Sequence, residues 1–168
     1  MKKGLSLIET LICLAILSVT FLLFTNVIMS MSRSYISLRT VRNLDLAAIN
    51  TMDIMTREIR NASSVDASSI LNTNPGTLVL NDVDSSGNIT QKTFTIVSQQ
   101  VHIKSGVVDN GSLDPTPITV PNLIFRSFSG GVSSAVKIEM TLEDKEGNAT
   151  RDQKYYSTII LRGSYKND

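Results

Sequence analysis

Cysteine, histidine and tryptophan are almost absent: the 168 residues include one cysteine, one histidine and no tryptophan. The single cysteine, Cys13, excludes an intramolecular disulfide, so the fold must be stabilised by packing. His102 has no second histidine or cysteine beside it, whereas metal sites need several ligands. The formal net charge of +1 gives no bulk attraction to nucleic acid. We therefore expect no enzyme centre, no bound cofactor and no nucleic-acid partner.

A long apolar run occupies residues 5–31, and Glu9 is its only charged residue. About 20 apolar residues are enough for a helix to cross a bilayer. An acid inside such a segment costs about 3 kcal/mol on insertion scales, which indicates a function for it. Lys2 and Lys3 precede the run and the next base is Arg33, so the positive-inside rule places the C-terminal bulk outside the cytoplasm. A cleaved signal peptide is disfavoured because its apolar core is typically about 7–15 residues.

The helical pattern continues beyond the apolar run, through residues 32–63. No proline or glycine interrupts residues 5–63, and Asn61 begins a weaker pattern that indicates the end of the helix. Steps of three, four and seven residues predict one apolar face, formed by Tyr35, Leu38, Val41, Ala48, Met52, Met55 and Ile59. We expect this amphipathic half to cover one face of a sheet.

Residues 64–168 have the texture of short strands and turns. The predicted strands are 77–80, 89–97, 100–104, 118–120, 123–128, 135–142 and 154–161. Residues 84–88, 109–111 and 143–148 carry the Asp, Asn, Ser and Gly residues that are typical of turns. A long helix followed by hairpins predicts an α+β fold with an antiparallel sheet.

The N-terminal motif has the sequence Lys3-Gly4-Leu5-Ser6-Leu7-Ile8-Glu9-Thr10-Leu11. It resembles the prepilin processing site of type IV pilin-like proteins, although many members begin the mature chain with phenylalanine rather than leucine. The resemblance implies that residues 1–4 are a cytoplasmic leader. It also implies that a membrane prepilin peptidase cuts between Gly4 and Leu5 and methylates the new amino group of Leu5.

A wider and less specific resemblance covers most of the chain. Residues 44–62 are similar to the amphipathic helix of J-type minor pseudopilins and PilW-like minor pilins, and residues 156–163 are similar to their last strand. The resemblance implies a pilin-like fold and a minor subunit that helps to initiate or cap a filament of a type IV pilus, type II secretion or competence system. It further implies an inner-membrane state before assembly, contact with an assembly platform, and pairing with other major and minor pilins near the filament tip.

Glu9 is the candidate residue for that assembly. A free amine at Leu5 is positive, and in lipid it would pair with a carboxylate of its own chain or of a neighbour. Two charges about 4 Å apart gain about 4 kcal/mol at an effective dielectric of about 20. The sequence therefore predicts that Glu9 sets subunit register.

Two sites in the C-terminal part have weaker signals. Asp82, Asp84, Ser86 and Asn88 resemble the first half of a calcium loop, but the twelfth position is threonine rather than glutamate, so a plain hairpin turn is favoured. We interpret His102 as a half-exposed strand residue.

Two rival functions remain open from the sequence. The first is a bitopic membrane-anchored protein whose outer domain binds a ligand and never polymerises, which predicts an uncut N-terminus and a tolerated change at Glu9. The second is a surface-anchored enzyme, which is disfavoured because no nucleophile and base stand together outside the membrane segment.

Overall fold

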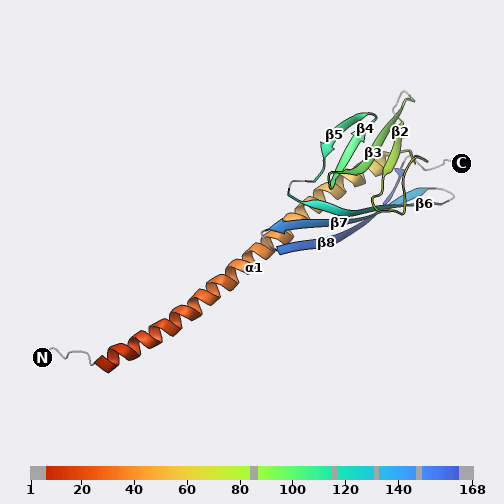
Figure 1. The fold of residues 1–168 in the computed structure, drawn as a ribbon. Helices are drawn as coiled ribbons and strands as arrows, with labels where there is room; N and C mark the ends of the chain where they lie inside the picture. Colours follow the sequence, from red (N-terminus) through yellow and green to blue (C-terminus); the bar gives the residue numbers. More distant parts are fainter. Residues whose placement is uncertain (1–6, 84–86, 115–116, 131–132, 147–148, 163–168) are drawn as a thin grey trace. The chain divides into compact units, whose positions relative to one another are not determined.

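A computed structural model describes residues 7–83, 87–114, 117–130, 133–146 and 149–162. The chain divides into two compact units, Met1–Arg39 and Thr40–Asp168. The described part of the first unit is helix, and the second unit contains the remaining helical residues and all the strands (Figure 1). The predicted order of one long helix followed by antiparallel β-structure is confirmed.

Helix α1 spans Leu7–Asn61, so it includes residues of both units. Its 55 residues contain neither proline nor glycine, so every internal amide is able to join the helical ladder. The last turn carries Arg60, a favourable position for a cation because the helix dipole is negative there. The amide of Ala62 still donates to the Glu58 carbonyl oxygen at 3.0 Å, and β1 follows directly.

The β-structure forms two antiparallel sheets rather than the one that the sequence predicts. The first has the order β1-β2-β3-β4-β5 and the second the order β6-β7-β8. Their bounds are β1 Ser64–Val65, β2 Leu78–Val83, β3 Ile89–Val97, β4 Gln100–Ser105, β5 Val108–Ser112, β6 Thr119–Ser129, β7 Ser134–Glu146 and β8 Ala149–Ile160.

The division has a physical cause at the margin of β6. Residues 70–77 lie along that margin: the amides of Asn72 and Gly76 donate to the carbonyl oxygens of Phe125 and Leu123 at 2.9 and 2.8 Å. The Asn74 side chain adds a bond to the Pro121 carbonyl oxygen at 3.1 Å and receives one from the Leu123 amide at 3.0 Å. Because these groups already pair β6, another strand has no place there and the first sheet does not continue into the second.

Several strand boundaries differ from the sequence expectation. The predicted strands 118–120 and 123–128 form one strand, β6, whose pairing is irregular between Thr119 and Asn122, next to Pro121, which has no amide proton. The turn predicted at residues 109–111 was wrong, because these residues lie in β5. The strand accommodates them by a register shift against β4 and by the positive φ of 99° at Gly111. The short strand β1 was not predicted.

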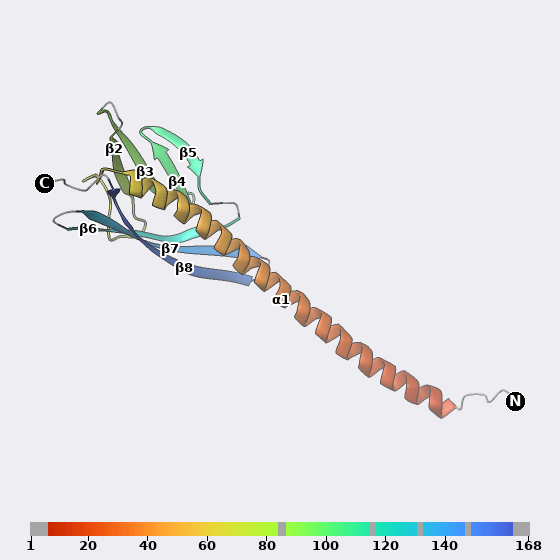
Figure 2. The same cartoon turned by 180° about the vertical axis from the view of Figure 1, so that it is seen from behind.

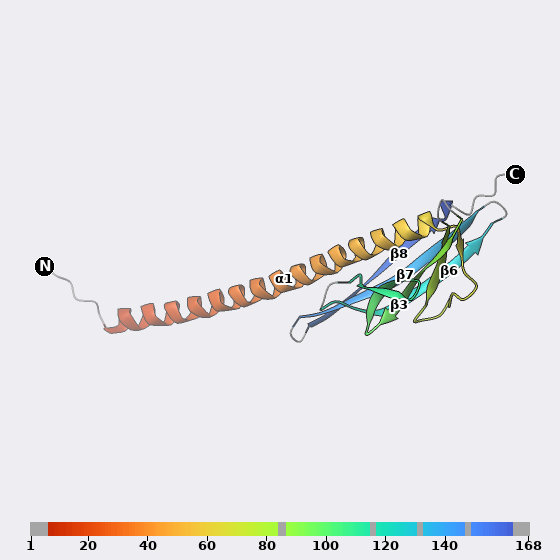
Figure 3. The same cartoon turned by 90° about the horizontal axis from the view of Figure 1, so that it is seen from above.

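The buried face of α1 is rotated from the predicted one. Ala48, Met55 and Ile59 are buried as expected, and the full buried set is Thr40, Leu44, Ala47, Ala48, Thr51, Met55 and Ile59. Tyr35 and Leu38 are exposed, because the buried positions of the helix begin at Thr40. Small residues at 47, 48 and 51 fit a helix that packs closely against strands. In Figures 2 and 3 residues 40–61 run along the two sheets.

One core joins this helical face to both sheets. Phe94 of β3, Phe125 of β6 and the β7 residues Val136, Ile138, Met140 and Leu142 are fully buried or nearly so, together with Leu44 and Met55 of the helix. In β7 these apolar residues alternate with the polar residues Lys137, Glu139 and Glu143, which are partly exposed, and Thr141, which is buried. This is the two-residue period of a strand with one face in the core.

We predict that Met55→Ala destabilises the second unit by about 2–5 kcal/mol, because Met55 is fully buried and the change leaves a cavity. The matched control is Ile49→Ala on the same helix, where the side chain is 66% exposed and the expected change is about 0.5 kcal/mol or less. Urea unfolding of the full chain in detergent micelles, followed by circular dichroism, measures both. Equal effects of the two substitutions would contradict the assigned face.

Candidate functional site

The apolar segment of α1, residues 7–31, exposes a long series of large apolar side chains. Its large apolar side chains are between 52% and 82% exposed. This segment makes α1 long and apolar enough to cross a membrane. Contiguous apolar surface of this extent marks a contact with lipid or with other protein.

Four of the five hydroxyl groups of this segment are satisfied within the helix itself. They donate to backbone carbonyl oxygens three or four residues earlier: Thr10 to Leu7 at 2.8 Å, Ser18 to Leu14 at 2.8 Å, Thr20 to Ile16 at 2.8 Å and Thr25 to Phe21 at 2.9 Å. In hydrocarbon, where water is absent, polar groups must find partners inside the protein. These four hydroxyl groups are therefore compatible with an apolar environment.

Glu9 lies in the first turn of the described helix and carries the only charge between Lys3 and Arg33. The positive end of the helix dipole favours an acid at this position. Gly4 and Leu5, the predicted cleavage and methylation residues, lie outside the described residues. The cleavage motif is therefore supported by the sequence alone, whereas the structure shows that Glu9 is helical.

One side of the apolar segment carries a shallow, open groove. It is lined by Cys13, Ile16, Leu17, Thr20, Phe21 and Phe24. These residues recur at steps of three and four, so they lie on one helix face and offer a row into which the ridge of another helix fits. Cys13 is a free, exposed thiol on this face and acts there as a small apolar residue.

In the second unit the buried carboxylate of Asp114 joins α1 to β4. Its two oxygens accept hydrogen bonds from the Thr51 hydroxyl and the Val101 amide, both at 2.7 Å. Burial raises the pKa of Asp114, because desolvation outweighs these two hydrogen bonds. Both oxygens are occupied by structural partners, so we assign Asp114 a structural role.

His102 is a strand residue, as the sequence predicts, but its side chain is 18% exposed rather than half-exposed. Its Nδ1 atom lies 3.1 Å from both carboxylate oxygens of Asp109 in β5. The Gly111 amide and His102 together lower the pKa of Asp109. The pair holds β5 against β4 where their register shifts.

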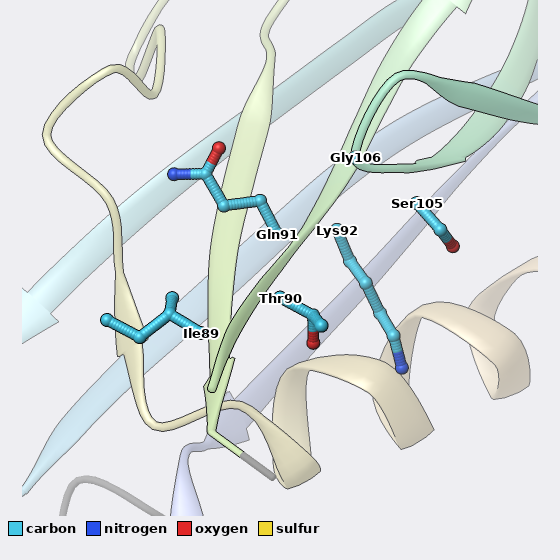
Figure 4. A pocket seen from close by; sticks show the side chains of 6 residues that line it. All are labelled: Ile89, Thr90, Gln91, Lys92, Ser105 and Gly106. Atoms are coloured by element: carbon cyan, nitrogen blue, oxygen red, sulfur yellow. The ribbon is translucent and has the colours of Figure 1, made fainter. Parts of the chain in front are cut away.

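Half of the predicted calcium loop is described. Asp84 and Ser86 lie outside the described residues, while the Asp82 carboxylate lies 3.7 Å from Lys92 Nζ, which also pairs with Glu58 at the end of α1. Figure 4 shows the Lys92 side chain directed from β3 toward the helix, beside a pocket lined by Ile89, Thr90, Gln91, Lys92, Ser105 and Gly106. Within the described ranges no three His, Cys, Asp or Glu side chains gather as a metal site. Calcium binding stays a prediction.

A polar cluster that the sequence analysis missed lies around Asp66. One carboxylate oxygen accepts from the amide and the hydroxyl of Ser68 at 2.9 and 2.6 Å. The other accepts from the side-chain amides of Asn81 and Gln91 at 3.0 and 3.4 Å. These bonds, those from Ser68 foremost, lower the pKa of Asp66 to about 2. The Asp-x-Ser spacing of a side-chain-stabilised turn was the available signal.

Comparison of the chain with protein-family models, with curated proteins and with solved structures finds no match. The functional argument therefore rests on the residues of this chain and on the geometry described above.

We predict that Asp66→Asn lowers stability at neutral pH, with a difference from the wild type that closes as the pH falls toward 2. The lowered pKa means that the ionised carboxylate stabilises the folded state above its usual pKa of 3.8, and that this stability is lost as the pH falls through about 2. Asparagine also turns an amide donor toward the donors of Asn81 and Gln91.

Urea unfolding at a series of pH values tests this, with Asp152→Asn, an exposed carboxylate in β8, as the control. A difference between Asp66→Asn and the wild type that is the same at pH 7 and below pH 3 would show that the charge of Asp66 does not contribute.

Proposed function

We propose that this chain is a minor pilin or pseudopilin, a non-enzymatic subunit of a type IV pilus, type II secretion or competence filament. In this proposal it is made as a prepilin, cut after Gly4 by a prepilin peptidase, methylated at Leu5 and held in the cytoplasmic membrane by residues 5–31. It then enters an extracytoplasmic filament, where it helps to initiate or cap assembly near the tip.

The observation that carries the proposal is that one uninterrupted helix has an exposed apolar first part and a second part that buries one face in a β-domain. The N-terminal residues of α1 are apolar on every side and hold one acid, whereas the residues from Thr40 onward bury one face in a β-domain. An anchor alone needs only about 20 apolar residues and no acid. A filament subunit needs a helix that is stable in lipid and then among other helices.

Both environments suit the exposed apolar segment. Four of its hydroxyl groups are satisfied within the helix, so these groups need no partner from lipid or from neighbouring helices. The row from Cys13 to Phe24 offers a face for helix packing. Major and minor pilins would pack there, and the membrane assembly platform would act on the same segment during extraction.

Glu9 supplies the specific interaction in this scheme. In an apolar surrounding its carboxylate has a strong preference for a cationic partner, and the methylated amine of Leu5 in a neighbouring subunit provides one. A misregistered subunit leaves both charges unpaired at a cost of several kcal/mol. The pairing thus selects one axial position out of many that apolar packing alone would allow.

The first prediction from this function concerns the N-terminus. Mass spectrometry of the protein from native membranes should show a chain that begins at Leu5 and is one methyl group heavier than its sequence mass. The control is the same protein from cells without the peptidase, where residues 1–4 should remain. An intact start in the presence of the peptidase would favour the bitopic anchor that does not polymerise.

The second prediction concerns Glu9→Gln, which keeps the size of the side chain and removes its charge. We expect normal membrane insertion and normal cleavage, but a fall of about tenfold or more in filament incorporation, since about 1.4 kcal/mol of lost pairing energy is a factor of about ten. Quantitative immunoblotting of sheared filaments against membranes measures the ratio. Thr10→Val is the matched control, because its hydroxyl bonds only the Leu7 carbonyl oxygen. Wild-type incorporation of Glu9→Gln would remove the role given to this carboxylate.

A further inference from the structure

The three-stranded sheet has one covered margin and one open margin. The side of β6 away from β7 is paired by residues 70–77. On the other side of the sheet β8 is the last strand, and within the described residues no strand pairs with its far side. Figures 1 and 2, seen from opposite directions, both show β8 at the outer margin. A strand margin of this kind offers unpaired backbone groups to another chain.

The charges of β8 divide the strand into two halves. Arg151, Asp152 and Lys154 stand in the first half, and charged residues on an edge strand discourage pairing with other chains. The second half, Tyr155–Ile160, contains no charged residue. Residues 155–160 are therefore the part of β8 where an added strand would pair with no charged residue.

A shallow groove lies at this uncharged end. It is lined by Arg60 from the last turn of α1, by Thr158, Ile159 and Ile160 of β8, and by Arg162. Two arginines from separate segments therefore line the groove at the strand end, and no acid is among the described residues that line it. Guanidinium groups bind carboxylates through paired, charge-assisted hydrogen bonds.

Apolar side chains lie next to the groove on the outward face of the sheet. Ile160 of β8 is 52% exposed and Tyr156 is 61% exposed, and Ile160 is opposite Ala135 of β7, which is opposite Phe128 of β6. A strand laid beside β8 would place alternate side chains over this face. The outward face supplies apolar contact, and the two arginines supply charge.

We propose that residues 155–160 of β8 receive an extended segment of a partner protein, which adds to the sheet as a further strand and places an acidic side chain between Arg60 and Arg162. Backbone hydrogen bonds give such a complex its affinity, and the side-chain contacts give it specificity. The positive charge of the two arginines favours a partner segment that carries a carboxylate. This surface is formed by residues of the second unit alone, so the proposal holds whether or not the chain enters a filament.

The test uses the full chain in detergent micelles and a designed probe, an acetylated hexapeptide of alternating threonine and valine that ends in glutamate. Hydrogen–deuterium exchange of residues 155–160 should slow by about tenfold at a peptide concentration about ten times its dissociation constant. The same peptide with N-methyl groups at alternate amides is unable to form strand hydrogen bonds and should give no slowing.

Charge variants test the role of the groove. The double substitution Arg60→Glu and Arg162→Glu should weaken binding of the glutamate peptide at least tenfold and permit binding of the same peptide ending in lysine. Recovery with lysine also shows that the variant is folded. The control Arg57→Glu changes an exposed base one turn earlier on α1, paired with Asp53 at 2.8 Å, and should leave binding unchanged.

Three results would overturn the proposal. They are no slowing at millimolar glutamate peptide, slowing by the N-methylated peptide equal to that by the unmodified one, and equal weakening by Arg57→Glu and by the double variant.

Discussion

The burial of one face of α1, beginning at Thr40, is the constraint on which the rest of the structure depends. Before that position every large apolar side chain of residues 7–31 is exposed, and after it the buried positions follow a single face as far as Ile59. Helix propensity alone does not produce this change, because no proline, glycine or cap interrupts residues 7–61. The backbone is helical on both sides of Thr40, so the difference in burial comes from the side chains.

Polar contacts fix the second half of the helix against the β-structure. Thr51 bonds Asp114, Glu58 pairs with Lys92, and Asp45 accepts a hydrogen bond from the Tyr155 hydroxyl at 2.8 Å. Burial and the Asp45 carboxylate raise the pKa of Tyr155, so its hydroxyl stays a donor throughout the physiological range. A typical hydrogen bond adds about 0.5–1.5 kcal/mol net, so these contacts define the position of the helix more than they supply its stability.

Local patterns in the sequence were sufficient for the main features of the fold. The absence of proline and glycine marked the helix, and the alternation in Val136, Ile138, Met140 and Leu142 marked the buried face of β7. Long-range pairing was not accessible in this way. The margin of β6 is covered by residues 70–77, which are about 50 positions away in the sequence and have no strand pattern, so the division into two sheets could not be inferred.

The candidate sites also differ in whether a local sequence pattern was enough to identify them. Glu9 was identifiable because a charge in an apolar run has a large cost wherever the run folds. The rotated face of α1 was not, because Thr40 and Thr51 are polar residues that become buried only through packing, and Thr51 through its bond to Asp114 as well. The Asp66 cluster likewise joins residues 66, 68, 81 and 91, which only the pairing of β1, β2 and β3 brings together.

The two proposed contact surfaces differ in the kind of information that each provides. In the apolar segment the packing of helices is permissive, since many axial positions bury similar area, and one charge pair must select among them. At the margin of β8 the backbone bonds are equally permissive, because any strand is able to make them, and the two arginines restrict the choice to an acidic segment. In both places a non-specific interaction, helix packing or strand pairing, supplies the contact area. A small number of charges selects the partner or its position. A chain with a net charge of only +1 can therefore discriminate between partners through where its few unbalanced charges lie.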